Sequence, residues 1–215
     1  MKGYWQQLTL SLVVSVMSVF TLSGCEESDA ALHQAQPTPR PAHYLSQDGV
    51  GPINAATPFN LHLIGDAFQG LNVTEETNFI DGDKYPVITI KQRTKPLLAI
   101  NPDHEHQKVF SVVIYDNYIG NRLEHKIGTK FVDIYPADKV EECAPGMEEL
   151  AGKVLCRAPS AGNILYLFSG NWEGSKNALP PLPVLADWRI ESFIWKPPLQ
   201  TASNPPAPAF PEPSN

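Results

Sequence analysis

Six strand-like segments separated by short breaks lie in the central part of this 215-residue chain and restrict the folds open to it. Each is rich in valine, isoleucine, leucine and aromatic residues, and glycine, proline, asparagine or aspartate follows, which is the pattern of strands joined by turns. The segments are 87–93, 96–101, 108–116, 152–158, 163–170 and 188–196. Because consecutive strands with short links pair antiparallel, we expect a mainly β domain with antiparallel sheets.

Two short helices are expected, one ahead of each group of three strands. The stretch TPFNLHLIGDAF predicts a helix with Thr57 as its N-cap and Pro58 at its first position. The stretch TKFVDIYP predicts a second helix, with Thr129 as its N-cap and Pro136 as the residue that stops it. The domain is therefore expected to contain two runs of one helix and three strands.

The two runs align with each other and suggest an internal duplication. Thr57 and Phe59 align with Thr129 and Phe131, and the closing strands VFSVVIYD and RIESFIWK align as well. Sequence identity between the halves is low, so chance similarity between two α-β-β-β runs is the alternative. The duplication is thus a hypothesis about the architecture of the domain.

The N-terminus has the pattern of a secretory signal that ends at a cysteine. Lys2 precedes an apolar stretch at 8–22, which at about fifteen residues is shorter than the roughly twenty that a membrane-spanning helix needs. The closing residues Leu-Ser-Gly-Cys, ending at Cys25, look like a lipobox, the processing site of bacterial lipoproteins. This resemblance implies that Cys25 becomes the N-terminus and carries acyl chains, which anchor a protein stably when two or more are present. An uncleaved transmembrane anchor, or an ordinary signal peptide with a chance cysteine, is the alternative.

The chain divides by composition into four parts. Residues 1–24 are the expected signal peptide, and 25–43 form a polar tether that contains prolines. The apolar and periodic part, 44–196, is the expected periplasmic domain. The proline-rich tail, 197–215, is expected to be disordered or extended, with docking to a partner as its alternative role. Because Glu26, rather than aspartate, follows the cysteine, we expect attachment to the periplasmic face of the outer membrane.

The charge of the chain argues against nucleic acid as a partner. The formal net charge is -7, and the signal peptide contributes a lysine to it, so the mature chain is more acidic still. The sequence has no basic cluster that would neutralise phosphates or bind an acidic membrane surface. Attachment to the membrane is therefore expected through lipid.

Cys143 and Cys156 remain as a pair once Cys25 is assigned to lipidation. In an oxidising compartment an even number of cysteines favours a disulfide, and two free buried thiols are the alternative. Because the sequence has no C-x-x-C motif, a redox enzyme is not expected.

Two further stretches contain candidate binding residues. In PDHEHQ, His104 and His106 are weak candidates for a zinc or copper site, but a solvated loop is the simpler interpretation, and no metal or other cofactor is expected. In FSGNWEG, Trp172 is a candidate contact for a glycan or protein partner, with a structural turn as the alternative. Trp188 and Trp195 are an odd number of positions apart on one predicted strand, so one is expected in the core and the other outside it. Trp188 is the candidate partner contact of this pair.

The motifs of common hydrolases are absent from the sequence, which has no G-x-S-x-G, S-x-x-K or H-E-x-x-H. We therefore expect a non-enzymatic envelope protein that binds a protein or cell-wall partner. A carrier or sensor for a small apolar ligand held between two sheets is the first alternative. A hydrolase that acts on an envelope polymer is the second.

An ordered set of motifs runs through the domain. In order along the chain these are GVGPINAATP, KIGTKFVDIY, the two cysteines of the domain, FSGNWEG and DWRIESFIW. This set resembles the RpoE-regulated lipoproteins, the YfeY-like family of Gram-negative envelope proteins. The resemblance implies a sandwich-like β fold, a lipid anchor and control by the sigma-E envelope-stress response, and it supplies no known biochemical activity. The proline-rich tail and the DHEHQ loop depart from the family pattern, so the resemblance supports no function for either.

Replacement of Cys25 tests the anchor. The change Cys25→Ser removes the thiol that accepts the acyl chain, so palmitate labelling should disappear and unprocessed precursor should accumulate. Labelling that persists in the variant would disprove the lipobox.

Overall fold

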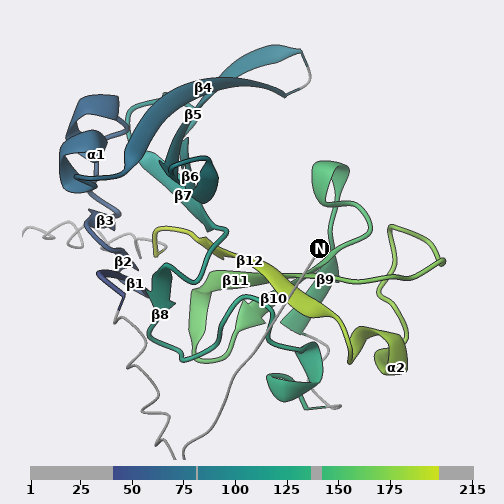
Figure 1. Ribbon diagram of the computed structural model, residues 1–215. Helices are drawn as coiled ribbons and strands as arrows, with labels where there is room; N and C mark the ends of the chain where they lie inside the picture. Colours follow the sequence, from purple (N-terminus) through teal and green to yellow (C-terminus); the bar gives the residue numbers. More distant parts are fainter. Residues whose placement is uncertain (1–40, 81, 137–141, 199–215) are drawn as a thin grey trace, which may run out of the picture. The chain divides into compact units, whose positions relative to one another are not determined.

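The protein is built mainly from two β-sheets (Figure 1). The computed structural model describes residues 41–80, 82–136 and 142–198. The expected signal peptide, Cys25, most of the tether and most of the tail lie outside the described residues. Among the residues described, no helix is long and apolar enough to cross a bilayer.

The larger sheet has eight strands, and every neighbouring pair in it is antiparallel. In spatial order the strands are β4 (Asn72–Ile80), β5 (Asp83–Gln92), β6 (Lys95–Pro102), β7 (Val109–Ile114), β12 (Arg189–Trp195), β11 (Ala161–Ser169), β10 (Val154–Ala158) and β9 (Cys143–Pro145). The prediction of a mainly β fold with antiparallel sheets is therefore confirmed.

The smaller sheet has four short strands, in the order β3 (Ile53–Asn54), β2 (Gly49–Val50), β1 (His43–Ser46) and β8 (Ile119–Asn121). β1 pairs in parallel with β8, and the other two pairs are antiparallel. The helical segments are α1 (Leu61–Ala67), η1 (Phe131–Asp133), η3 (Glu148–Leu150) and α2 (Leu182–Leu185). Two sheets and two short α-helices form the sandwich-like arrangement that the sequence predicts.

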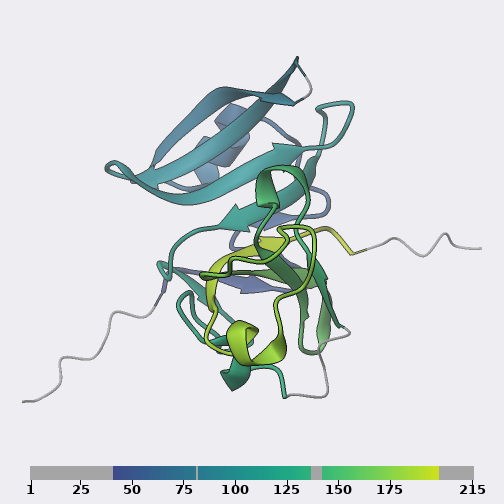
Figure 2. The same ribbon diagram turned by 90° about the vertical axis from the view of Figure 1, so that its right-hand side faces the viewer.

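The larger sheet consists of two halves that meet at its centre. The first half is the meander β4–β7, the second is the meander β9–β12, and the closing strands β7 and β12 pair with each other (Figures 1 and 2). The three pairs between the closing strands are Ile114 with Phe193, Val113 with Ile194, and Val112 with Trp195. We refer to Val113 and Ile194 as the central pair.

Matching hydrogen bonds precede both closing strands. The Thr57 carbonyl accepts a hydrogen bond from the N–H of Val109 at 3.1 Å, and the Thr129 carbonyl accepts one from the N–H of Ile190 at 3.0 Å. These contacts place Val109 and Ile190 at equivalent positions in their strands. The two members of the central pair, Val113 and Ile194, lie the same number of residues further along. A register shift also lies at matching places in the β6–β7 and β11–β12 pairings. The order of elements and the register therefore repeat between the halves, in agreement with the proposed duplication.

The two predicted N-caps are wrong. Asn60, and not Thr57, caps α1, because its side-chain oxygen accepts a hydrogen bond from the N–H of Leu63 at 3.0 Å. The backbone of Thr57 pairs with the start of β7, so the helix begins only after that contact. Thr129 is held in the same way against β12, and its hydroxyl accepts a hydrogen bond from the N–H of Lys126 at 3.1 Å. The second predicted helix is therefore only the single 3₁₀ turn η1, which has no side-chain cap.

The predicted strand segments correspond to β5, β6, β7, β10, β11 and β12. The two edge strands of the larger sheet, β4 and β9, and the whole smaller sheet are not predicted by the sequence pattern. β4 has the largely polar sequence NVTEETNFI, and the other missed strands have only two to four residues. Neither case gives the long apolar alternation from which a buried strand is recognised.

One row of side chains crosses all eight strands of the larger sheet, and we call it the core row. Its members, opposite one another in the register, are Val73, Ile90, Leu98, Ile114, Phe193, Tyr166, Cys156 and Cys143. The smaller sheet and α1 join the same core through Leu45, Ile53 and Phe68. The row ends in the disulfide between Cys143 and Cys156, so the predicted bridge is confirmed. This bond ties the short edge strand β9 to the core.

Both tryptophans of the last predicted strand lie in the core. Trp188 is 3% exposed and Trp195 is 0% exposed. The expectation that one of them faces outward is wrong because β12 begins at Arg189, so strand alternation does not relate the two side chains. The Trp188 indole covers Gly170, where an added methyl group would lie 2.3 Å from the ring.

An alanine at Gly170 should therefore destabilise the domain. Gly170→Ala forces the buried indole of Trp188 to move, at a cost of about 1–3 kcal/mol in the free energy of unfolding. Gly162→Ala is the matched control, since nothing in the described part of the chain lies within 4 Å of its added methyl group. Urea unfolding of both variants measures the difference, and equal midpoints would contradict the prediction.

Candidate functional site

The face of the larger sheet opposite the core row is called here the open face. Side chains of five neighbouring strands line up across it, namely Thr89, Ala99, Val113, Ile194 and Leu165. Val87 and Leu167 are buried on this face. They do not belong to the main core, which lies on the opposite face and includes residues of the smaller sheet and α1. Ser111 and Ser192 are buried polar residues on it. The open face is thus partly enclosed and mixed in polarity, as binding surfaces commonly are.

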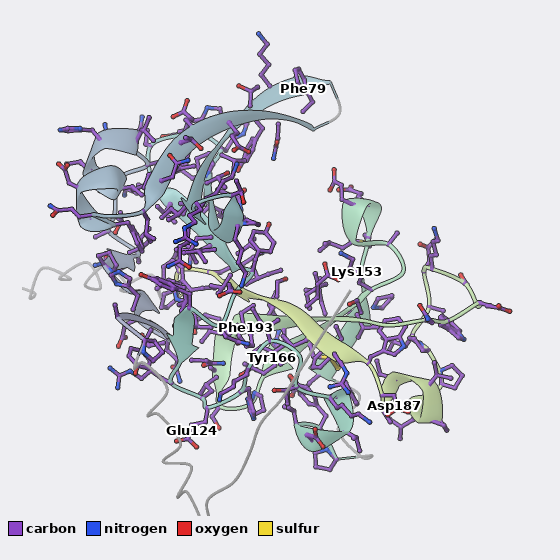
Figure 3. The ribbon with its side chains drawn as sticks, viewed as in Figure 1. Phe79, Glu124, Lys153, Tyr166, Asp187 and Phe193 are labelled. Carbon is purple, nitrogen blue, oxygen red and sulfur yellow. A yellow bond between two sulfur atoms is a disulfide. The ribbon has the colours of Figure 1, made fainter. Side chains whose placement is uncertain are left out.

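A groove of about 620 Å³ lies at the first-half end of the open face. We call it the hairpin groove, and it is lined by Thr77, Asn78, Phe79, Tyr85, Val87, Asn101 and Glu149. All of these residues except Glu149 belong to β4, β5 and β6, whereas Glu149 belongs to η3 of the second half. Figure 3 places Phe79 near the free end of the β4–β5 hairpin. The groove therefore lies where this hairpin faces η3.

Two walls of the hairpin groove are fixed by hydrogen bonds to neighbouring residues. The Tyr85 hydroxyl donates to the Pro102 carbonyl at 2.5 Å, and burial raises the pKa of Tyr85, which keeps the phenol protonated as a donor. The Asn101 amide Nδ2 donates to Ser111 Oγ at 3.1 Å. Phe79, by contrast, is 64% exposed. In the register Tyr85 is opposite Asn78 and Phe79 is opposite Lys84, so the Phe79 side chain projects from the other face of the hairpin, at the β4 edge of the groove.

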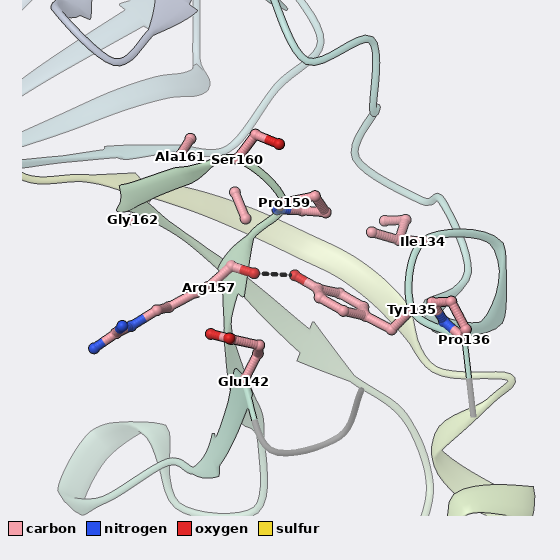
Figure 4. Close-up of a pocket in the computed structure, with 10 residues that line it drawn as sticks. Ile134, Tyr135, Pro136, Glu142, Arg157, Pro159, Ser160, Ala161 and Gly162 are labelled. Atoms are coloured by element: carbon pink, nitrogen blue, oxygen red, sulfur yellow. Dashed lines mark hydrogen bonds between the residues drawn. The ribbon is translucent and has the colours of Figure 1, made fainter. Parts of the chain in front are cut away.

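A second cavity, of about 560 Å³, lies beside the β10–β11 turn (Figure 4). The Tyr135 hydroxyl in its wall donates to the Arg157 carbonyl at 2.5 Å, and burial strongly raises the pKa of Tyr135. The side chains of Arg157 and Glu142 supply one charge of each sign. The phenol is already bonded within the fold, so the cavity offers the charged groups of Arg157 and Glu142 and the hydroxyl of Ser160.

A polar cluster joins β8 and the segment after it to the core row. His125 Nδ1 lies 2.9 Å from Tyr166 Oη, and Asn121 Nδ2 donates to the same oxygen at 3.4 Å. Burial lowers the pKa of His125 against the opposing effect of Glu124, and burial raises the pKa of Tyr166 to about 12. Both groups are therefore uncharged at neutral pH, and the phenol can donate to the imidazole. The cluster borders a cavity of about 250 Å³.

In the three arrangements, several polar groups are already held in hydrogen bonds within the fold. His125 contacts a buried phenol rather than a serine or threonine hydroxyl, and both thiols of the domain are used in the disulfide. Among the residues that the structure describes, none of the three cavities pairs a nucleophile with a base in the way that covalent catalysis requires. The chemistry available is hydrogen bonding, aromatic contact and single charges.

The PDHEHQ loop is a turn rather than a ligand cluster. Asp103 Oδ1 accepts hydrogen bonds from two backbone N–H groups of its own loop, at 2.8 and 3.2 Å. His106 packs edge-on against Tyr85 with 5.6 Å between the ring centres, and His104 is exposed. In the described segments no group of three or more His, Cys, Asp or Glu side chains is placed to hold a metal ion.

The predicted tryptophan contacts differ from the aromatic residues that the structure exposes. Trp188 lies in the core, which corrects its prediction as a partner contact. Trp172 is partly buried against the core, and its ring lies over Gly174, where an added methyl group would come within 2.1 Å of it, as in a structural turn. Sequence reasoning missed Phe79 and Tyr85 of the hairpin groove. The apolar Phe79 at the end of a largely polar strand sequence is the signal that would have revealed it.

These features define a mainly β, two-sheet domain of two matching halves with open grooves. The family described as Protein of unknown function (DUF1131) matches residues 40–197, and the chain belongs to that family. The chain is 26% identical over 153 residues to the Uncharacterized protein YfeY of Escherichia coli (strain K12), which covers 71% of this chain and 78% of the relative. The crystal structure of the uncharacterized protein YfeY from Escherichia coli matches with a TM-score of 0.61 and 25% identity, over 71% of this chain and 99% of that chain. The resemblance to a YfeY-like domain of unknown function is thereby confirmed.

The contact between His125 and Tyr166 should make stability depend on pH. Because the pKa of His125 is lower in the folded chain than its unfolded value of about 6.5, the unfolded chain takes up the proton first as the pH falls. The free energy of unfolding should therefore decrease below about pH 6.5. His125→Gln should reduce this decrease, whereas His104→Gln, at an exposed position, should leave it unchanged. Urea unfolding across this pH range measures the effect, and an unaltered profile in His125→Gln would contradict it.

Proposed function

We propose that this protein is a lipid-anchored envelope protein whose domain binds a protein partner on the periplasmic face of the outer membrane and catalyses no reaction. The lipobox pattern that ends at Cys25 supports the anchor. The resemblance to RpoE-regulated lipoproteins supports a role during envelope stress. The observation that carries the binding role is the hairpin groove with its fixed polar walls, which lies against the edge strand β4 and its largely exposed Phe79.

The hairpin groove suits an extended and uncharged segment of the partner. Its lining contains one ionisable carboxylate, Glu149, and is otherwise made of aromatic, aliphatic, amide, phenol and hydroxyl groups. Amide and hydroxyl groups can bond to the backbone of a bound segment, and Tyr85 can contact its side chains. Phe79, on the opposite face of the hairpin, can contact a partner that covers the edge strand β4. β4, which forms part of the groove, is an edge strand of nine residues. Its outer backbone groups add a second means of holding an extended chain.

A carrier of small apolar ligands has less support from the interior of the domain. Such a carrier needs an apolar cavity between its sheets. Here large side chains fill that space, and Tyr166, Phe193 and Trp195 are at most 1% exposed. A hydrolase also has less support, because His125 of the polar cluster faces a phenol.

Truncation of Phe79 tests the binding role. Phe79→Ala should weaken partner binding by about 2 kcal/mol, or roughly thirtyfold, as expected for an exposed aromatic side chain that a partner on the β4 edge covers. Crosslinking in intact cells followed by quantitative mass spectrometry compares the captured proteins. Val132→Ala is the matched control, because Val132 is 55% exposed but belongs to η1 rather than to the groove.

The proposal requires a captured protein that is lost with Phe79→Ala and kept with Val132→Ala. The same proteins in equal amounts from both variants would disprove it. The melting temperature of Phe79→Ala serves as a check on folding, and it should stay near that of the unaltered protein because the side chain is mostly exposed.

A further inference from the structure

The outer edge of β4 is suited to pairing with another strand. β4 forms nine consecutive pairs with β5 without a register shift, so it is regular along its whole length. Among the described residues no strand pairs with its other side. Natural sheet edges are commonly blocked by lysine, proline or a β-bulge, or are very short. β4 has none of these features, whereas β9, at the opposite edge, has three residues and includes Pro145.

Hollows lie beside β4 on both faces of the sheet. The hairpin groove includes Asn78 and Tyr85 of the open face. On the face of the core row, a hollow of about 530 Å³ lies between α1 and β4, and we call it the helix hollow (Figure 1). Because successive side chains of a strand point to opposite faces, a strand added at β4 would direct its side chains alternately toward the two hollows. Backbone pairing combined with pockets for alternate side chains is how sheet edges bind extended peptides.

The helix hollow combines apolar and acidic side chains. Phe59 and Val73 in its lining are partly buried against the core. Asp66 and Glu75, also in its lining, are exposed carboxylates, and His62 Nε2 lies 3.6 Å from Asp66 Oδ2. No lysine or arginine lines this hollow. The combination fits an incoming lysine or arginine, whose aliphatic stem packs on apolar surface while its charged end reaches a carboxylate.

Glu75 is the carboxylate of β4 that remains for an incoming cation. Its neighbour Glu76 points to the open face, where Lys91 Nζ donates to Glu76 Oε1 at 2.5 Å, and this hydrogen bond lowers the pKa of Glu76. The ion pairs of the described residues do not include Glu75. The same charges disfavour a second copy of β4 as the added strand. In an antiparallel pair centred on Glu76, this residue would lie opposite its counterpart, and like charges in that position are destabilising.

We propose that an extended segment of another protein pairs with β4 as an additional edge strand of the larger sheet, and that a lysine or arginine of this segment enters the helix hollow and binds Glu75. This inference rests on the proposed binding function and deepens it by naming the chemistry of the bound segment. The hairpin groove, on the other face, then receives the uncharged neighbours of that basic residue. Phe79 lies on the same face of β4 as Glu75, so a further side chain of the segment can cover it.

Photocrosslinking in intact cells that produce the full chain tests the chemistry of the bound segment. The probe p-benzoylphenylalanine replaces Thr77, an exposed residue on the same face of β4 as Glu75, and mass spectrometry identifies the peptide joined to it. We expect a peptide of another protein with a lysine or arginine within about three residues of the attachment site. Glu75→Lys in the same chain should lower the yield of this peptide about tenfold or more, because two like charges would then meet. Glu75→Gln, which removes the charge and keeps the size, should lower it less.

Glu173→Lys is the matched control for the change in charge. Glu173 is exposed and lines neither hollow, so its replacement should leave the yield unchanged. Equal melting temperatures of the Glu75→Lys and Glu173→Lys chains check that both are folded. In the Glu75→Lys chain, replacement of the basic residue of the captured peptide by glutamate should restore the yield, because the two charges are then exchanged.

The outcomes separate this inference from the proposed function on which it rests. An equal yield from the unaltered and Glu75→Lys chains, or no recovery after the charge exchange, would overturn the inference and leave the binding role that Phe79→Ala tests intact. Equal losses in Glu75→Lys and Glu173→Lys would also overturn it, since net charge alone would then matter. Attachment to a second, differently tagged copy would overturn the choice of another protein as the partner. A probe at position 77 that captures nothing, in cells where Phe79→Ala still removes a partner, would overturn the added strand, and no partner in either experiment would overturn both proposals.

Discussion

The pairing of β7 with β12 is the contact on which the rest of the larger sheet depends. Each half is a meander, so its strands are joined to one another in sequence, whereas the two halves meet in this sheet through one antiparallel pair. Val112, Ile114 and Trp195 on its core side are 0% exposed, so the hydrogen bonds of the pair form together with a buried apolar contact. Loss of this pairing would separate the larger sheet into its two halves, and β7 and β12 would each become an exposed edge strand.

The groove arises where the symmetry of the two halves fails. The outer strand of the first half, β4, has nine residues, and that of the second half, β9, has three. The disulfide holds β9 against β10, while the β4–β5 hairpin is long and ends near Phe79 (Figure 3). Two equal halves would present equal edges. Because β4 is longer, the β4–β5 hairpin of the first half extends toward η3, and the hairpin groove lies between the hairpin and η3.

The sequence predicts the buried strands well and the site poorly, for a physical reason in each case. β5, β7 and β12 are recognisable because burial demands apolar residues, and the cysteine pair is recognisable because its chemistry has few alternatives. The predicted N-caps at Thr57 and Thr129 are wrong because backbone pairing with the closing strands overrides the local preference of threonine for a helix N-cap. The groove is not predicted because its lining residues, among them Phe79, Asn101 and Glu149, come from distant parts of the chain. No short pattern records that these residues meet, and a polar edge strand gives little signal of its own.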